Sequence, residues 1–419
     1  MGYLSKSDLK ALATAHRLIR FHAIPLLYRK VSIHTVQPSA HEKAKGLAQT
    51  PYILKWINVL IFIAPLHSAV TRNMEIFNNF ITTFSKMPNL RELELRRITL
   101  NSHAAMEILG TPLMSLTCDL CSFTIERSAP ALARQSSVTK LQLSLMLDDD
   151  FPGSPPPFFN NFPNVETLDL VVPYRAYIDF PIFPSLTALI IRSAIGLGML
   201  HIILRQSPHI ARLSCIQRSL KDHEGTLINI PRLQHIEAPI PAVIQLLESP
   251  ELTSIVILTR SAYSDNQCDT INRLLLAIQR GPAQRVTSLD MTVWFQNREQ
   301  ARELLERLSD AAPNLSRFTL RVDPFSIQTP LASPLYNGSA RLPKLESLVI
   351  SIILIGKEPP QPDVIPDDTV QSFAREFLET LVRPICPSLQ VARIFPWYDS
   401  FRRTILEGEG AIWRFERQD

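Results

Sequence analysis

Cysteine and histidine are the residue types in this chain with the widest range of chemistry, but their spacing does not indicate a shared metal site or a disulfide framework. Cys118 and Cys121 form a Cys-x-x-Cys pair, but neither a second such pair nor a close pair of histidines completes a structural zinc site. The five cysteines are few, scattered and odd in number, which does not indicate a disulfide framework. We therefore expect Cys118 and Cys215 to pack in the core, and we expect no metal ion or other cofactor.

Motifs that position a catalytic group or a phosphate are missing from the sequence. The ten histidines include no HExxH, and the chain has no G-x-S-x-G, no P-loop and no G-x-G-x-x-G. The run GLG at Gly196–Gly198 precedes an apolar segment and is expected to form a tight turn rather than a phosphate cradle. The sequence therefore favours a protein that is not an enzyme.

Composition narrows the possible partners. The 419 residues carry 43 basic and 39 acidic side chains, a net charge of +4 that is too balanced for a nucleic-acid-binding surface. The longest apolar run, Ile57–Leu66, is far shorter than the roughly 20 residues of a membrane span. Charges are spread through the N-terminal segment, unlike a signal peptide. We expect a protein of the cytoplasm or nucleus that binds neither nucleic acid nor membrane.

One phrase, Pro-x-apolar-x-x-apolar-x-apolar, recurs along the chain, as in MPNLRELELRR (Met87–Arg97) and FPNVETLDLVV (Phe162–Val172). Chance would give roughly one ungapped match at this composition, and eight are present. From Pro163 to Pro250, the prolines of successive phrases are 19 to 24 residues apart, a period typical of leucine-rich repeats. The eight prolines are Pro88, Pro163, Pro184, Pro208, Pro231, Pro250, Pro313 and Pro343.

Each repeat is expected to hold a short strand and a helix. Alternating residues such as Leu93 and Leu95 point to one side of a strand, and the proline ends the preceding helix. Apolar spacing predicts helices over 76–84, 271–278, 304–308 and 373–381, with Gly281 as the C-cap of the second and Asp367 and Asp368 as caps of the last. The predicted fold class is an α/β leucine-rich-repeat solenoid over residues 50–419, a curved parallel sheet with outer helices in about twelve irregular repeats.

Three proline-rich stretches interrupt this pattern. They are residues 148–161, 323–341 and 357–368. They are expected to be insertions on one rim of the solenoid, or else partner-binding segments of polyproline type.

The first 35 residues do not follow the repeat. Ser7 before Asp8 predicts a helix start, Leu9 and Leu12 begin an apolar face, and Pro25 is expected to end the helix before the strand-like run LLYRKVSI. At YLSKSDLKAL, ATAHRLIRFHA and IPLLYRKVSI the chain resembles the second half of an F-box that leads directly into leucine-rich repeats. This is the arrangement of F-box/leucine-rich-repeat proteins, especially the divergent kind numerous in fungi.

The resemblance implies a short helical F-box-like cap over residues 1–35. An F-box also has an opening helix of Leu-Pro-x-Glu type, which is missing from the matched part, so the segment is expected to be a truncated F-box. In the family, this element binds the Skp-type adaptor that connects a receptor to a cullin ubiquitin ligase. The residues that the resemblance assigns to the adaptor surface are Leu4, Leu9, Leu12, Pro25, Leu27 and Tyr28. Alternatively, the same residues only cover the end of the solenoid.

Strand residues that lie between the inward leucines are expected to form a concave binding face. They mix charged, small and apolar groups, which suits a protein partner better than a polyanion. The sequence predicts a non-catalytic substrate-recognition subunit of an SCF-type ubiquitin ligase; the alternative is a leucine-rich-repeat scaffold without ligase coupling. The candidate partner-binding residues are Glu94, Arg96, Asp169, Arg192, Arg212, His235, Glu237, Asp290, Arg317 and Arg321.

Overall fold

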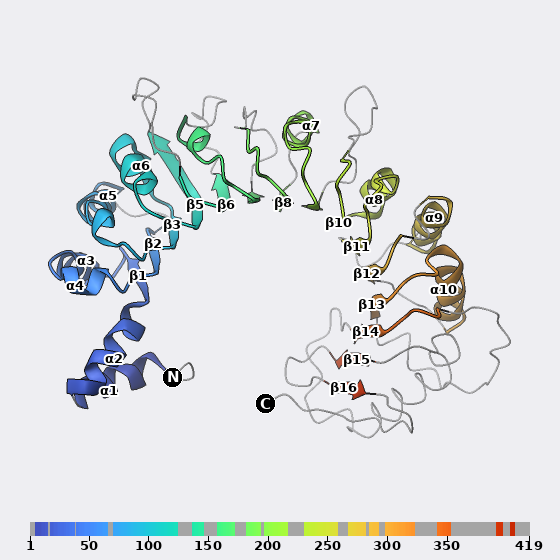
Figure 1. The fold of residues 1–419 in the computed structure, drawn as a ribbon, viewed down its shortest axis with the longest axis horizontal. Helices are drawn as coiled ribbons and strands as arrows, with labels where there is room; N and C mark the ends of the chain where they lie inside the picture. The colour runs from blue at the N-terminus through green and yellow to red at the C-terminus, as the bar shows by residue number, and fades with distance from the viewer. Residues whose placement is uncertain are drawn as a thin grey trace. The chain divides into compact units, whose positions relative to one another are not determined.

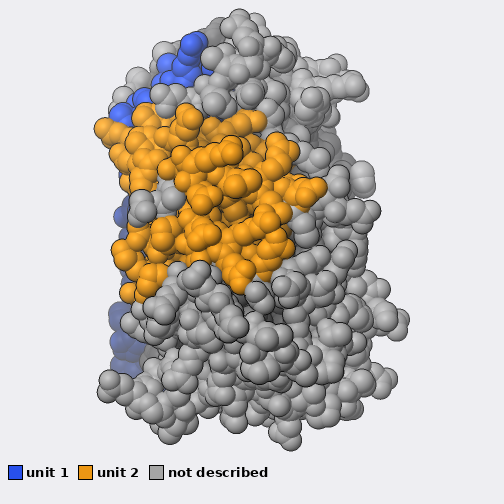
Figure 2. Space-filling view, turned by 90° about the vertical axis from the view of Figure 1, so that its right-hand side faces the viewer, with its two compact units in different colours: residues 1–210, 221–228 blue, residues 211–220, 229–419 orange. Residues whose placement is uncertain are grey.

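The structure is a computed structural model in two compact units. Unit 1 holds residues 1–210 and 221–228, and unit 2 holds residues 211–220 and 229–419 (Figure 2). The described residues are 5–15, 17–37, 39–65, 70–124, 136–145, 157–171, 182–193, 197–216, 230–258, 267–281, 285–292, 298–322, 342–352, 391–396 and 403–406.

Unit 1 begins with two helices and continues as strands that alternate with helices and short 3-10 turns (Figure 1). Its main strands pair in parallel in the order β1-β2-β3-β5-β6-β7-β8, and β4 pairs with the end of β5. The elements are α1 (Lys6–Ala15), α2 (Arg17–Tyr28), β1 (Lys30–His34), α3 (Ala40–Ala48), α4 (Pro51–Leu54), β2 (Val59–Ile63), α5 (Val70–Ile81), η1 (Phe84–Lys86), β3 (Glu92–Arg96), β4 (Thr99–Asn101), α6 (Ser102–Leu109), β5 (Ser115–Thr124), β6 (Lys140–Leu145), η2 (Pro157–Asn161), β7 (Thr167–Val171), β8 (Ala188–Ile191) and α7 (Leu197–Gln206).

Unit 2 repeats the same plan. Its strands pair in sequence order from β9 to β16, and all the pairs are parallel except the antiparallel β15–β16 pair. The elements are β9 (Arg212–Cys215), β10 (His235–Ala238), α8 (Ile240–Leu246), β11 (Ser254–Ile257), α9 (Gln267–Arg280), β12 (Ser288–Thr292), α10 (Arg298–Ala311), β13 (Arg317–Val322), β14 (Ser347–Ile352), β15 (Val391–Pro396) and β16 (Arg403–Leu406).

Strand pairing places the repeated apolar residues in continuous buried rows. Side chains alternate across a strand, so the two leucines of each phrase point to the same side. Helices α3, α5 and α6 lie along that side of the sheet in unit 1, as do α8, α9 and α10 in unit 2 (Figure 1). One fully buried row of unit 1 is Leu60, Leu93, Leu116, Leu141, Leu168 and Leu189; its counterpart in unit 2 is Leu213, Ile236, Ile255, Leu289 and Phe318. Each unit is therefore a leucine-rich-repeat solenoid of α/β class, as the sequence predicts.

The proline of the phrase occupies the second position of a tight turn. The carbonyl of the residue before the proline accepts a hydrogen bond from the N–H three residues further along the chain; the N–H of Leu90, for example, donates to Met87 O at 3.1 Å. The same bond, at 3.1 to 3.3 Å, closes all eight ungapped phrases. Proline suits this position because its fixed φ matches the turn and its missing N–H is not needed there. The proline thus begins the turn into the next strand, besides lying where the preceding helix ends.

A second backbone contact fixes each repeat against the next. One carbonyl just before a strand accepts hydrogen bonds from two consecutive N–H groups of the following repeat. Asn58 O, for example, accepts from the N–H of Arg91 at 2.9 Å and of Glu92 at 3.0 Å. In unit 1 these carbonyls belong to Arg29, Asn58, Arg91, Met114, Thr139 and Glu166, and in unit 2 to Ala211, Gln234, Thr253, Thr287 and Ser316.

The predicted helices within the described ranges are present. Helix α5 with η1 covers residues 76–84, α9 covers 271–278, and α10 covers 304–308. The N–H of Gly281, directly after α9, bonds to the carbonyls of Ala277 at 3.1 Å and Ile278 at 3.2 Å. The predicted helix over 373–381, with Asp367 and Asp368, lies outside the described residues. So do the stretches 323–341 and 357–368 and most of 148–161, of which η2 is the described part.

The N-terminal segment differs from the prediction of one helix that ends at Pro25. Two helices are present, and α2 continues through Pro25 to Tyr28. Position 25 lies in the third turn of α2, where the proline costs one intrahelical bond without ending the helix. Helix α1 begins at Lys6 after Ser5, not at Ser7. The Ser5 hydroxyl accepts from the Asp8 N–H at 3.2 Å, and the Asp8 carboxylate accepts from the Ser5 N–H at 3.0 Å, which is a capping box.

An aromatic cluster fills the core beneath β2 and α5. Phe62, fully buried, packs its ring against Phe77 at a centroid distance of 5.1 Å and against Phe80 at 6.4 Å. We expect Phe62→Ala to lower the free energy of unfolding by about 3–5 kcal/mol, because it leaves a cavity between strand and helix. Urea denaturation followed by circular dichroism would measure it.

The matched control is the neighbouring residue Ile61, which is half-buried and points to the other side of β2. We expect Ile61→Ala to cost about 1 kcal/mol or less. An equal loss in both variants would show that the helix side of the sheet is not the main core.

Candidate functional site

The side of each sheet opposite the buried rows is the candidate binding surface; we call it the open face. The strands place the same position of each phrase in line, one strand apart. In unit 1 the central row of the open face is Ser32, Ile61, Glu94, Thr117, Gln142, Asp169 and Ile190. In unit 2 the first two rows are Arg212, His235, Ser254, Ser288 and Arg317, then Ser214, Glu237, Val256, Asp290 and Thr319.

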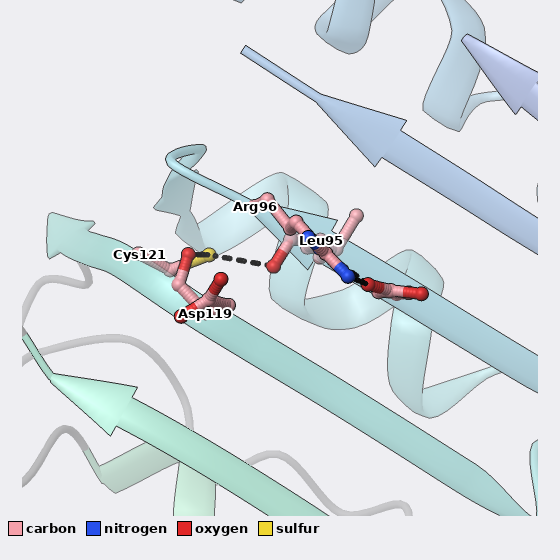
Figure 3. A network of polar contacts seen from close by, with 5 residues as sticks. Leu95, Arg96, Asp119 and Cys121 are labelled. Atoms are coloured by element: carbon pink, nitrogen blue, oxygen red, sulfur yellow. Dashed lines mark hydrogen bonds and ion pairs between the residues drawn. The ribbon is translucent and has the colours of Figure 1, made fainter. Parts of the chain in front are cut away.

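Glu94 and Arg96 form an ion pair on β3 (Figure 3). They are two residues apart on one strand, so their side chains lie on the same face. Arg96 is paired in register with Asp119 of β5, so a second acidic residue lies at the neighbouring strand position. The Arg96 side chain is 46% exposed, so this pair adds little to stability and remains accessible to a partner.

Asp169 and Arg192 form a bidentate ion pair across two repeats. The Arg192 Nε lies 2.9 Å from Oδ1 and 3.0 Å from Oδ2 of Asp169, and a terminal guanidinium nitrogen lies 2.8 Å from Oδ2. The Asp169 side chain is only 11% exposed, whereas that of Arg192 is 61% exposed. The carboxylate therefore orients the guanidinium, and the guanidinium faces the solvent.

The strand β5 bends beside this row, and the sequence gives no sign of it. Arg97 and Leu120 have φ values of 60° and 52°, and the pairing of β5 with β6 shifts between Asp119 and Cys121. The Arg97 N–H donates to Asp119 O at 2.8 Å, and the Cys121 thiol donates to Leu95 O at 3.3 Å (Figure 3). Such φ values favour glycine or asparagine, and the residue types here are neither.

Cys118 is part of the core, as predicted, and its neighbour Cys121 lies there too. Both thiols are buried, and Cys215 is buried in unit 2. A hydrogen bond with Cys121 and burial raise the pKa of the Cys118 thiol, which keeps it protonated. Within the described ranges, no group of three or more His, Cys, Asp or Glu side chains could hold a metal ion.

Charges on the open face of unit 2 surround His235. Its Nδ1 lies 2.9 Å from Ser254 Oγ, and its side chain is half-buried between Arg212 and Glu237. Burial lowers the pKa of His235, the Glu237 carboxylate opposes this, and the Arg212 guanidinium adds to it. The imidazole is therefore neutral at neutral pH and serves as a hydrogen-bonding group.

The remaining predicted partner residues lie at strand positions of unit 2. Asp290 pairs in register with Val256 and Thr319, and Arg317 is exposed and pairs with Ser288 and Ser347. Arg321 lies in register with Thr292, but its side chain is outside the described part.

The residues predicted to bind the adaptor lie in or near the α1–α2 hairpin. Leu4 is outside the described residues and Leu9 is buried, while the other four are half-buried: Leu12, Pro25, Leu27 and Tyr28. The most exposed apolar side chains of the hairpin are instead Leu18 at 71% and Phe21 at 72%. Leu18 and Phe21 were not predicted as surface residues, because the sequence predicted one straight helix, and the apolar face of that helix would have buried Leu18.

Comparisons with known proteins give a limited result. No protein-family model matches the sequence. No curated protein matches it either. Among solved structures, an internalin from Listeria monocytogenes is similar, with a TM-score of 0.33 and 15% identity over 74% of this chain and 94% of that chain. In the described part of the chain, no helix has the length and apolar character needed to cross a membrane.

The environment of His235 can be tested by NMR titration of its ring. We expect a pKa below the ordinary value of 6.5, which Glu237→Gln lowers further and Arg212→Gln raises. Because the folded-state pKa is depressed, the unfolded chain binds more protons below about pH 6.5, and the free energy of unfolding falls as the pH drops.

The control for this titration is Lys344→Gln, which removes an exposed charge elsewhere in unit 2. It should leave the His235 titration unchanged. A shift of opposite sign in either test variant would show that the open face is not arranged as described.

Proposed function

We propose that this protein is a non-catalytic substrate-recognition subunit of an SCF-type cullin ubiquitin ligase, acting in the cytoplasm or nucleus. Residues 1–35 dock on a Skp-type adaptor, and the repeats over residues 50–419 bind a target protein on the open face. The observation that carries this proposal is a helical hairpin with exposed apolar side chains, joined directly to the first strand of a leucine-rich-repeat sheet.

The hairpin has too few neighbours to bury its apolar residues. Helix α1 packs on α2, and α2 reaches β1 and α4 near its C-terminal end. Two helices cannot cover each other on all sides, so part of their apolar surface stays in water. Leu18 and Phe21 are each more than two-thirds exposed and lie three residues apart on α2, so they share one side of the helix, and adjacent exposed apolar side chains are typical of an interaction surface.

The open faces support a protein target for the repeats. Several described basic residues on them lie beside acidic ones: Arg96 beside Glu94, Arg192 beside Asp169, and Arg212 one strand from Glu237. A polyanion would need a continuous row of unpaired cations. Charges of both signs separated by serine, threonine and isoleucine fit a protein surface of complementary pattern.

A leucine-rich-repeat scaffold without ligase coupling is the second candidate. It is favoured by the half-buried positions of Leu27 and Tyr28 and the burial of Ala23, which show that the end of α2 covers the first repeat. In that case the hairpin serves only to close the end of the apolar core.

Binding to a purified Skp-type adaptor separates the two candidates. We expect the parent chain to bind, and the double variant Leu18→Ala, Phe21→Ala to bind about 10- to 100-fold more weakly, because each truncation removes a large exposed apolar contact. Isothermal titration calorimetry would give both dissociation constants.

The matched control is Met106→Ala, Met114→Ala, which truncates two exposed apolar side chains of the repeats. It should bind as the parent does. Absence of adaptor binding by the folded parent would contradict the ligase proposal and favour the scaffold. Equal binding by parent and hairpin variant would place the adaptor elsewhere.

A further inference from the structure

A cavity of about 480 Å³ lies where the α1–α2 hairpin meets the first repeat. This volume falls within the usual range for small-molecule sites. The cavity wall comes from α1, α2, β1, α3 and α4, and much of it is apolar: Leu27, Val31, Leu47 and Ile53, with the Tyr28 ring.

The charged side chains of the cavity have one sign. Lys10 and Lys43 line it, and none of the nine lining residues, all described, is acidic. The Lys43 ammonium also donates to the Ser32 carbonyl, which holds it at the wall. The wider segment has the same bias: residues 1–65 contain six lysines and three arginines but only Asp8 and Glu42 as acidic residues. Asp8 is bonded to Ser5 at the start of α1, and Glu42 is an exposed residue in the first turn of α3.

Gly46 supplies a second, independent observation. It lies inside α3, where glycine is a poorer helix former than almost any other residue. Packing does not require it, because a Cβ at this position would meet no atom within 4 Å. The backbone of Gly46 lines the cavity. Gly46 is exposed, so the chain leaves open space beside the cavity at this point of α3.

We propose that this cavity is a binding site for a small amphiphilic carboxylate with an aliphatic body. The apolar body lies against Leu27, Leu47 and Ile53, and its carboxylate lies near the ammonium groups of Lys10 and Lys43. The Gly46 position gives the body room beside α3. The proposal does not rest on adaptor binding, because the cavity lies under the hairpin while the exposed Leu18 and Phe21 carry the docking surface.

Calorimetric titration of the full chain with decanoate, below its micelle concentration, tests the site. We expect saturable binding of one molecule, and about tenfold weaker binding by Lys10→Gln, Lys43→Gln, since two solvent-accessible ion pairs are lost. Decanol, which has the same body without the charge, should bind the parent and that variant equally. Lys86→Gln, an exposed charge change on η1, is the matched control and should bind decanoate as the parent does.

Gly46→Leu separates binding from folding. Leucine favours the helix over glycine and enters open space, so the thermal midpoint should stay the same or rise while decanoate binding is lost. Gly46→Ala should fold as well and keep most of the binding. Failure of the folded parent to bind decanoate, or full binding by Gly46→Leu, would overturn the proposal. Loss of adaptor binding in Gly46→Leu would assign the cavity to a protein partner, and would overturn it too.

Discussion

The structure depends on one carbonyl per repeat that accepts two consecutive N–H groups from the following repeat. This contact repeats between Arg29 and Asn58, between Asn58 and Arg91, and along both units with little change in distance. It fixes the start of each strand that takes part relative to its neighbour. A slip of one residue would turn the apolar residues to the open face, so this contact and the buried rows enforce the same register.

The fixed register also aligns the open-face residues of neighbouring strands into rows. Without this register, the polar residues of the separate strands would not line up. With it, equivalent positions form rows in which charged side chains of neighbouring strands lie next to each other. The Asp169–Arg192 pair shows the result, because the two residues are 23 positions apart in sequence and bond through three contacts. The N-terminal segment has a different physical character, with basic side chains in excess and exposed apolar groups. The two regions therefore suit different kinds of partner.

Much of this architecture can be predicted from sequence, because the repeated pattern Pro-x-apolar-x-x-apolar-x-apolar specifies both the turn and the strand that follows it. Pro88, Leu90, Leu93 and Leu95 suffice to place a turn, three buried residues and the alternate open-face positions. The α1–α2 hairpin could not be predicted in the same way, because Pro25 is tolerated inside a helix and the helix break lies elsewhere. The positive φ values of Arg97 and Leu120 have no signal in residue type; at Arg97 a hydrogen bond from its N–H to Asp119 O accompanies a conformation that the residue does not favour.

The proline turn has a consequence for how such a chain changes over time. The turn and the strand after it have the same form whether the next proline of the phrase is 19 or 30 residues away, so differences in repeat length lie outside the turn and the strand. Neighbouring open-face residues stay about 4.8 Å apart regardless. A point mutation there alters one site in an evenly spaced row and leaves the rest of the row in place. Single side chains of the open face can therefore change one at a time without any change to the core.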